Sequence, residues 1–198
     1  MIKATNKGGQ EIEPIAEGSY PARVYQMIEL GTIPAFQGQL QTKVRIGFEL
    51  PTEMFVFDEK KGEQPRVISQ DYTLSFNEKA KLRKVIMACD PEALKTDDDG
   101  FMEEFDVEKL IGKECLITIA QKPKQDKSGN YAFIDNCTRI PKGMTCPPAI
   151  NPVHILSYDK WDEEAFQKLP AFLREKIESS KEYQSLKGIV VKDDVPFD

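Results

Sequence analysis

Cationic and aromatic side chains are concentrated in the segment 113–140, KECLITIAQKPKQDKSGNYAFIDNCTRI, which contains two apolar runs. The apolar runs flank a loop of turn-forming residues, which is typical of a β-hairpin. Amines neutralise the phosphates of a nucleic-acid strand, and flat rings stack on its bases. The residues of this segment that suit such a strand are Lys122, Lys124, Lys127, Tyr131, Phe133 and Arg139. An ordinary hairpin with a solvated loop and two core rings fits the same pattern.

Earlier parts of the chain supply the same residue types. The stretch QTKVRIGFEL, residues 41–50, alternates polar and apolar positions, so its cations share one face of a strand and its apolar residues the other. The further candidates for contact with a nucleic-acid strand are Arg23, Tyr25, Phe36, Lys43, Arg45 and Tyr72. Each ring also fits a place in the core, Tyr72 and Phe133 most of all.

Five strands and one helix must position these side chains. The pattern predicts strands over 18–30, 41–50, 66–76, 112–121 and 131–140, a helix after Asn77 and a helical turn over 106–111. Residues 51–65 are predicted to form a long charged loop. One face of the first strand is predicted to carry Tyr20, Ala22, Val24, Gln26, Ile28 and Leu30.

Three strands, a helix and two more strands are the order expected of an OB fold. That fold is a mainly β, five-stranded barrel with a helix between strands 3 and 4. An SH3-like barrel lacks the helix, and a β-sandwich needs more strands than this sequence offers. We therefore predict an OB-fold nucleic-acid-binding domain over 1–150, followed by a helical arm and an acidic tail over 151–198.

The chain changes character after Ile140. Four prolines between 141 and 152 predict an extended strap, and residues 159–186 predict helices in two pieces, with Asp162 capping the first. The apolar stripe of these helices is Phe166, Leu169, Phe172, Leu173 and Ile177. This stripe either packs back on the barrel or docks on a second subunit or a partner.

The distribution of charge favours a nucleic-acid partner more than the net charge does. The 198 residues carry a formal net charge of −6, but the acid is concentrated in residues 90–108 and 159–198. The strand-rich remainder is mildly basic, and a phosphate responds to the local patch.

Four widely spaced cysteines predict free thiols, and neither a signal peptide nor a membrane-spanning run is predicted. We therefore expect a cytoplasmic protein, in the host cytoplasm if a phage encodes it.

Residue types that catalysis needs are sparse. Acids at 97–99, with Glu103 and Glu104, raise the alternative of a metal-dependent nuclease, but contiguous carboxylates in a loop cannot all turn toward one ion. His154 is the only histidine, no Cys-x-x-C pair is present and no glycine-rich phosphate loop occurs. We therefore predict no enzyme activity, no metal site and no cofactor.

The end of the chain carries the most specific sequence signal. Two acids precede an apolar residue, a proline and a phenylalanine: Asp193, Asp194, Val195, Pro196 and Phe197. This order resembles the acidic tip of bacterial single-stranded DNA-binding proteins, although Asp198 follows the phenylalanine and a helical arm replaces the Gly/Gln-rich linker of that family. The LIGKECLITI and LPAFLREKI stretches look like the OB-fold single-stranded DNA-binding proteins of tailed phages.

The resemblance implies a protein that coats and protects single-stranded DNA, with little sequence preference, during replication or recombination. It also implies that the tip recruits replication or repair proteins, with its phenylalanine entering an apolar pocket of the partner. Self-association along the DNA stays open. The competing interpretation is a protein-interaction or assembly module with an OB-like barrel and no affinity for nucleic acid.

Overall fold

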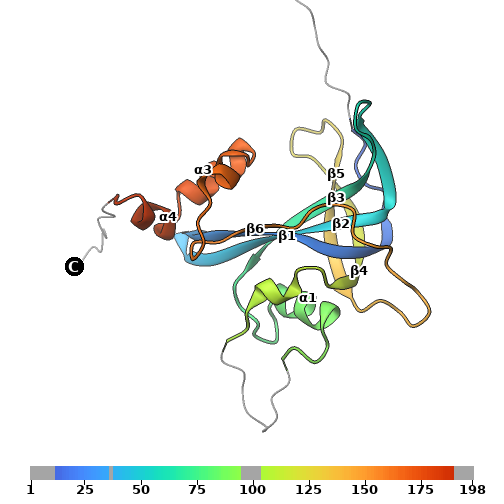
Figure 1. Ribbon diagram of the computed structural model, residues 1–198, viewed down its shortest axis with the longest axis horizontal. Coiled ribbons are helices and arrows are strands. Elements are labelled where there is room, and N and C mark those ends of the chain that lie inside the picture. Colours follow the sequence, from blue (N-terminus) through green and yellow to red (C-terminus); the bar gives the residue numbers. More distant parts are fainter. Residues whose placement is uncertain (1–11, 36–37, 95–103, 190–198) are drawn as a thin grey trace, which may run out of the picture.

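The computed structural model describes residues 12–35, 38–94 and 104–189 of the chain (Figure 1). Its strands are β1 (Gly18–Pro34), β2 (Leu40–Asp58), β3 (Gly62–Thr73), β4 (Glu114–Pro123), β5 (Asn130–Thr138) and β6 (His154–Leu156). Its helices are α1 (Lys81–Cys89), the 3-10 helix η2 (Val107–Leu110), α2 (Glu163–Gln167), α3 (Ala171–Glu178) and α4 (Lys181–Leu186). The protein is mainly β with some helices, as predicted. None of the described helices is long and apolar enough to cross a membrane.

Five antiparallel strands form one curled sheet in the order β3-β2-β1-β4-β5. β6 joins this sheet as a parallel neighbour of β1. The edge strands β3 and β5 approach each other, but no hydrogen-bond ladder joins them within the described ranges. The sheet is therefore a half-barrel, and α1, which follows β3 in the chain, packs against β4 and β5 (Figure 1).

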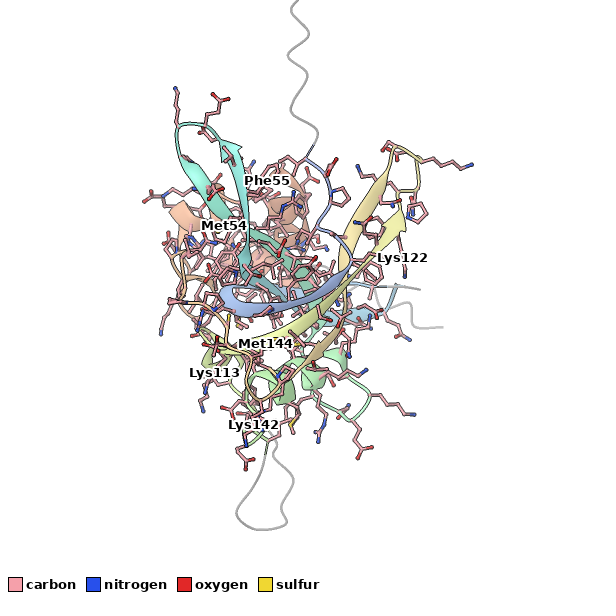
Figure 2. The ribbon with its side chains drawn as sticks, turned by 90° about the vertical axis from the view of Figure 1, so that its right-hand side faces the viewer. Met54, Phe55, Lys113, Lys122, Lys142 and Met144 are labelled. Atoms are coloured by element: carbon pink, nitrogen blue, oxygen red, sulfur yellow. The ribbon has the colours of Figure 1, made fainter. Side chains whose placement is uncertain are left out.

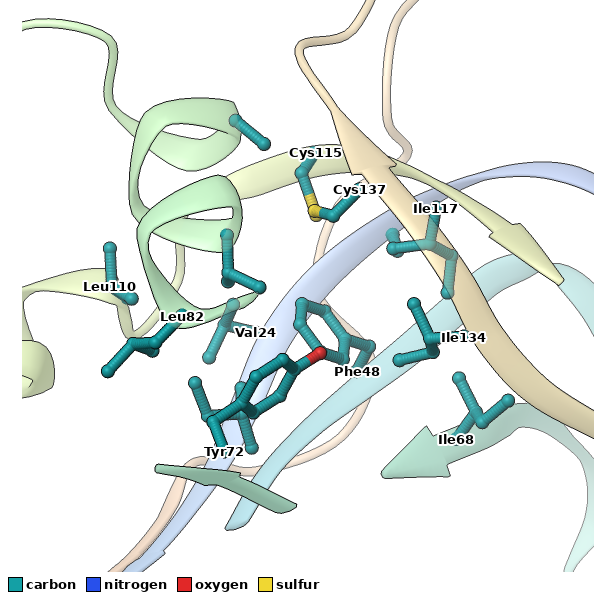
Figure 3. Packing of buried hydrophobic residues seen from close by; sticks show 14 of the residues in the cluster. Val24, Phe48, Ile68, Tyr72, Leu82, Leu110, Cys115, Ile117, Ile134 and Cys137 are labelled. Atoms are coloured by element: carbon teal, nitrogen blue, oxygen red, sulfur yellow. The ribbon is translucent and has the colours of Figure 1, made fainter. Parts of the chain in front are cut away.

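The inside of the curl holds the main core. Alternate residues of β2 are buried there, namely Val44, Ile46, Phe48 and Leu50, which confirms the predicted inward face of this strand. Side chains from the other strands and from α1 meet them; these include Val24, Ile68, Tyr72, Leu82, Ile117 and Ile134 (Figure 3). The apolar stripe of α1 thus closes one end of the half-barrel.

A β-bulge interrupts β1 at Tyr25. The pairing of β1 with β2 steps from Val24 opposite Phe48 to Gln26 opposite Gly47, so Tyr25 is an extra residue without a partner in the register. Gly47 makes room for the bulge, because a Cβ there would lie 2.9 Å from the Cβ of Gln26. An alanine at this position would push the two strands apart.

The bulge reverses the side-chain alternation of β1. Ala22, Val24 and Met27 face the main core, whereas Ile28 and Leu30 face a second apolar cluster on the other side of the sheet. The prediction of a single apolar face from Tyr20 to Leu30 is therefore wrong. Strict alternation assumes an uninterrupted strand, and one inserted residue moves every later side chain to the opposite face.

β2 and β3 form a longer hairpin than predicted. β2 reaches Asp58 and β3 begins at Gly62, so most of residues 51–65 are strand and not loop. The register between the two strands shifts between Leu50 and Met54. This irregularity hides the alternation from a sequence pattern, and the charged side chains beyond it imitate a loop.

The C-terminal arm packs on the side of β1 that faces away from the main core. Together with Ile28 and Leu30, its buried residues form the second apolar cluster; they are Leu156, Phe166, Leu173 and Ile177, with Tyr158, Trp161, Leu169 and Tyr183 beside them. The predicted apolar stripe therefore packs back on the sheet. Phe172 is the exception, since 56% of its surface is exposed.

Glu182 fastens α4 to the end of β1. Its carboxylate accepts hydrogen bonds from the backbone N–H and from the hydroxyl of Thr32, each at 2.6 Å. Gly31 permits this approach, because its φ is +76° and a Cβ there would lie 2.6 Å from Glu182 Oε2. The arm is thus held by polar contacts at its end as well as by the apolar cluster.

Replacing Phe166 by alanine tests whether the arm is part of the folded core. Phe166 is fully buried in the second apolar cluster. We expect the F166A variant to lose about 3–5 kcal/mol of unfolding free energy in a urea titration. Leu186→Ala, at a 45% exposed position of α4, should stay within about 0.5 kcal/mol of the parent. Equal stability of F166A and the parent would contradict the packing of the arm.

Two carboxylates of the arm have pKa values below their ordinary range. Hydrogen bonds from Lys187, Trp161 and Gln167 lower the pKa of Glu163 to about 2. Partial burial opposes the shift at Glu182, but the two hydrogen bonds from Thr32 leave its pKa lowered. A carboxyl with a lowered folded-state pKa stabilises the fold above its unfolded pKa, and this contribution is lost as the pH falls.

The arm should therefore loosen between pH 4.5, the ordinary value for a glutamate, and about pH 2. Trp161, the only tryptophan, reports this change, since it stacks on Tyr158 at 5.5 Å and donates to Glu163 at 3.0 Å. We expect an acid transition in Trp161 fluorescence that shrinks in Glu163→Gln. Glu178→Gln, at an exposed position of α3, should keep the full transition. An unchanged transition in Glu163→Gln would refute the assignment.

Candidate nucleic-acid interface

Five of the predicted contact residues gather on the β4–β5 hairpin. The register pairs Ala120 with Phe133 and Lys122 with Tyr131, while Ile134 of the same hairpin is buried in the main core. Because side chains alternate across a strand, the rings and the lysine stand together on the outward side. We name this surface the hairpin face; it consists of Lys122, Lys124, Lys127, Tyr131 and Phe133.

The hairpin face combines charge and rings at close range. Lys122 Nζ lies 4.5 Å from the centroid of the Phe133 ring, which is a cation–π contact. The Tyr131 and Phe133 rings lie 6.2 Å apart, and Tyr131 is 45% exposed. An ammonium beside an accessible ring can meet a phosphate while the ring stacks on the adjoining base.

The turn of this hairpin presents the other two lysines. Lys124 N donates to Gly129 O at 2.8 Å, which closes the turn, and Lys127 adopts a φ of 58° within it. Hydrogen bonds from the backbone and hydroxyl of Ser128 lower the pKa of Asp126, the one acid of the turn. Lys124 and Lys127 are exposed, so the end of the hairpin is positively charged.

The β2–β3 hairpin carries a second aromatic and cationic group that the sequence analysis did not include in the interface. The Phe55 and Phe57 rings lie 4.9 Å apart, and the guanidinium of Arg66 lies 4.5 Å from the Phe55 centroid. The signal was the apolar run MFVF at 54–57, which becomes informative only when these residues are known to be strand. Figure 2 shows this hairpin and the β4–β5 hairpin standing apart on the same side of the molecule.

A groove of about 270 Å³ lies between the two hairpins. Residues 12–15 line it, together with Phe57 and Arg66 on the β2–β3 side and Ala132 on the β5 side. Arg66 Nη1 donates to Glu13 O at 2.9 Å, which fixes the segment in place. The groove is mostly apolar, with Arg66 as the cation at its wall.

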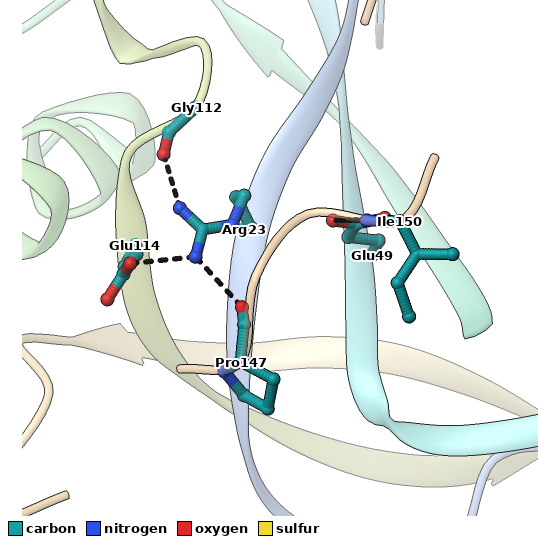
Figure 4. Close-up of polar contacts among 6 residues, drawn as sticks. All are labelled: Arg23, Glu49, Gly112, Glu114, Pro147 and Ile150. Atoms are coloured by element: carbon teal, nitrogen blue, oxygen red, sulfur yellow. Dashed lines mark hydrogen bonds and ion pairs between the residues drawn. The ribbon is translucent and has the colours of Figure 1, made fainter. Parts of the chain in front are cut away.

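Arg23 was predicted to contact DNA, but the protein itself engages its guanidinium (Figure 4). It donates to Gly112 O at 2.9 Å, to Glu114 Oε1 at 2.7 Å and to Pro147 O at 2.9 Å. Its side chain is only 14% exposed. The two terminal nitrogens of this arginine therefore hold the strap over the outer face of β1.

Glu49 is the partner of Arg23 in this clamp. It lies opposite Arg23 in the β1–β2 register and is fully buried. Its carboxylate accepts a hydrogen bond from the backbone N–H of Ile150 at 3.2 Å (Figure 4) and another from that of Asn151 at 2.8 Å. A buried carboxylate needs such donors, and the two backbone N–H groups of the strap in turn need an acceptor, so each side supplies the hydrogen bonds that the other requires.

Three further candidates on β1, β2 and β3 have partners within the protein. Tyr25 is half-buried, and burial, followed by the charge of Glu49, raises its pKa; its ring meets His154 edge-on at 6.4 Å. Arg45 Nη1 lies 2.6 Å from Asp71 Oδ1. Tyr72 is 3% exposed in the main core, where neighbouring side chains cover its ring, as the alternative interpretation of this residue expected.

The remaining candidates are less constrained. Lys43 shares the outward face of β2 with Arg45, and no ion pair of Lys43 is present within the described residues. Arg139 is exposed just after β5. Phe36 lies outside the described residues, and so does the predicted partner-binding tail, Asp193, Asp194, Val195, Pro196 and Phe197.

The described part of the chain contains no group of three or more His, Cys, Asp or Glu side chains arranged to hold a metal ion. Most of the acidic stretch that suggested a nuclease, residues 97–99 and Glu103, lies outside the described residues; Glu104 is exposed. Cations, rings and an apolar groove are therefore the chemistry that the described interface offers.

Removing the carboxylate of Glu49 tests the clamp. We expect Glu49→Leu to leave two backbone N–H groups of the strap without acceptors, at a cost of about 1–3 kcal/mol of unfolding free energy. Hydrogen exchange at Ile150 and Asn151 should become faster. Glu49→Gln keeps one acceptor oxygen and should lie between this variant and the parent. Unchanged exchange at both amides in Glu49→Leu would contradict the clamp.

Comparisons with known proteins do not add to these observations. No protein-family model matches the chain. No curated protein matches it either. The functional argument therefore rests on the residues described above.

Proposed function

We propose that the protein binds single-stranded DNA through the hairpin face, with little sequence preference. The observation that carries this proposal is the group of Lys122, Tyr131 and Phe133, in which an exposed ring and an ammonium lie within reach of one nucleotide. The exposed lysines of the turn extend the positive charge along the hairpin. Rings and amines recognise features that every nucleotide shares, so the sequence of the strand has little influence.

We further propose that the half-barrel is an OB fold. The strand order β3-β2-β1-β4-β5, with α1 between β3 and β4 in the chain, supports this assignment. The approach of β3 to β5 supports it as well, since these two strands are the ones that close such a barrel. In this fold the β4–β5 loop is a common nucleic-acid contact.

Coating and protecting DNA during replication or recombination requires binding and no catalytic group, so we propose that the protein is not an enzyme. Recruitment of replication or repair proteins through Asp193, Asp194, Val195, Pro196 and Phe197 is part of the same proposal. That part rests on the resemblance of the tail and on the physical suitability of one aromatic anchor beside acids.

Fluorescence anisotropy tests the proposal directly. A labelled oligothymidylate and a duplex of equal length are each titrated with the full chain at two salt concentrations. We expect tight binding to the single strand, weak binding to the duplex and a loss of affinity at higher salt. Absence of single-strand binding at low salt would overturn the proposal and favour a protein-interaction module.

Substitutions on the hairpin face then test whether this surface makes the contact with the single strand. Tyr131→Ala should weaken binding by about 1–3 kcal/mol, the value of one stacked base, whereas Tyr131→Phe keeps the ring and should bind like the parent. Lys124→Gln should reduce the salt dependence. Lys142→Gln is the charge-matched control, because Lys142 is exposed on the side of the molecule away from the hairpin ends (Figure 2). Equal losses in Lys124→Gln and Lys142→Gln would argue against a local site.

A further inference from the structure

An exposed ring with one cation against it lies where α3 meets β2. Phe172 is 56% exposed, although its neighbour Leu173 is buried in the second apolar cluster. The guanidinium carbon of Arg45 lies 5.6 Å from the centroid of the Phe172 ring. One face of this ring is therefore in contact with a cation, and much of the rest is open to solvent.

Asp71 holds two cations beside this ring. Its Oδ1 lies 2.6 Å from Arg45 Nη1 and its Oδ2 lies 2.6 Å from Lys176 Nζ, so one carboxylate bridges β2 and α3. Lys43, two residues before Arg45 in the chain, lies on the same face of β2. We name Lys43, Arg45, Phe172 and Lys176, with Asp71, the junction patch. Three cations and one acid leave it with a net positive charge.

The bridge prepares the junction patch for an anion. Asp71 occupies one donor of Arg45 and one of Lys176, while a guanidinium has five donors and an ammonium three. The side chains of Arg45 and Lys176 remain 20% and 38% exposed, so donors that Asp71 does not use can face a second anion together with Lys43. The bridge has already reduced the side-chain freedom that binding would cost. The Phe172 ring offers an accessible surface for a planar group next to these donors.

We infer that the junction patch is a second contact site for single-stranded DNA, in which Lys43 and Arg45 meet a phosphate and Phe172 stacks on a base. This inference rests on the proposed function and extends it from the hairpin to the C-terminal arm. Helix α3, which carries Phe172 and Lys176, and the ends of the two hairpins lie on the same side of β1, opposite α1 (Figure 1), so one strand can approach both.

A purely structural role explains only part of this arrangement. The Asp71 bridge ties α3 to the sheet, and it needs neither Phe172 nor Lys43. The packing of α3 relies on Leu173 and Ile177, which are buried, and an exposed phenylalanine adds little to it. Phe172 and Lys43 can therefore be changed while the bridge and the second apolar cluster remain intact.

The test measures the affinity of full-length variants for a labelled oligothymidylate of about 16 nucleotides, the upper end of the range for one OB fold. Phe172→Leu keeps an apolar side chain and removes the ring, and we expect it to weaken binding at least about fivefold. Phe172→Trp keeps an aromatic ring at this position and should bind the oligothymidylate like the parent. Lys43→Gln should lower the slope of log affinity against log salt by about 0.7, as expected for one lost phosphate contact.

Lys168→Gln is the control for the loss of one positive charge. Lys168 is exposed at the C-terminal end of α2, and its ammonium pairs with Glu164 at 2.6 Å, so its charge is already balanced within the protein. It should leave both affinity and salt slope unchanged. Urea titrations and Trp161 fluorescence should show that Phe172→Leu and Lys43→Gln fold like the parent.

The outcomes separate the two proposals. Failure of the parent to bind the oligothymidylate overturns the proposed function and this inference together. Parent binding that Tyr131→Ala weakens but Phe172→Leu and Lys43→Gln leave unchanged overturns only the junction patch. Losses in Phe172→Leu that Phe172→Trp recovers, with Lys168→Gln unaffected, establish the second contact site.

Discussion

The bulge at Tyr25 is the feature on which the rest of the structure depends. By adding one residue to β1, it turns Val24 toward the main core and Ile28 toward the arm. A single strand thereby belongs to two apolar clusters, and the half-barrel and the arm share its backbone. Close packing then makes the position of the arm a consequence of the strand register, without a flexible linker between them.

The cations of the protein divide into those used by the fold and those left for a ligand. Both terminal nitrogens of Arg23 donate within the protein, to two carbonyls and a carboxylate, and its neighbour Glu49 is buried beneath the strap. Lys122 and Lys124 remain exposed on a hairpin that projects from the core. Arg45 is intermediate, because one acid binds one of its donors and its side chain keeps 20% of its surface exposed.

Patterns of residues predicted the half-barrel strands, the inward face of β2 and the arm cap at Asp162, which accepts from Ala165 N at 3.0 Å. These features depend on local alternation and capping, which a sequence displays directly. The bulge in β1 and the extension of β2 beyond Pro51 depend on the partner strand, so they were missed. Tyr72 shows the same limit at the site, since only the position of α1 decides whether an aromatic ring on β3 is covered.

The short strand β6 has a consequence for how the chain avoids unwanted association. β4 pairs with β1 from Gly18 to Arg23 and then diverges, and β6 takes over the same edge from Gln26 to Ile28. Without β6, this part of β1 would offer unpaired N–H and C=O groups beside exposed apolar side chains, which is the template for pairing with another molecule. We therefore expect a chain cut before His154 to carry an unpaired strand edge, which favours pairing with another molecule.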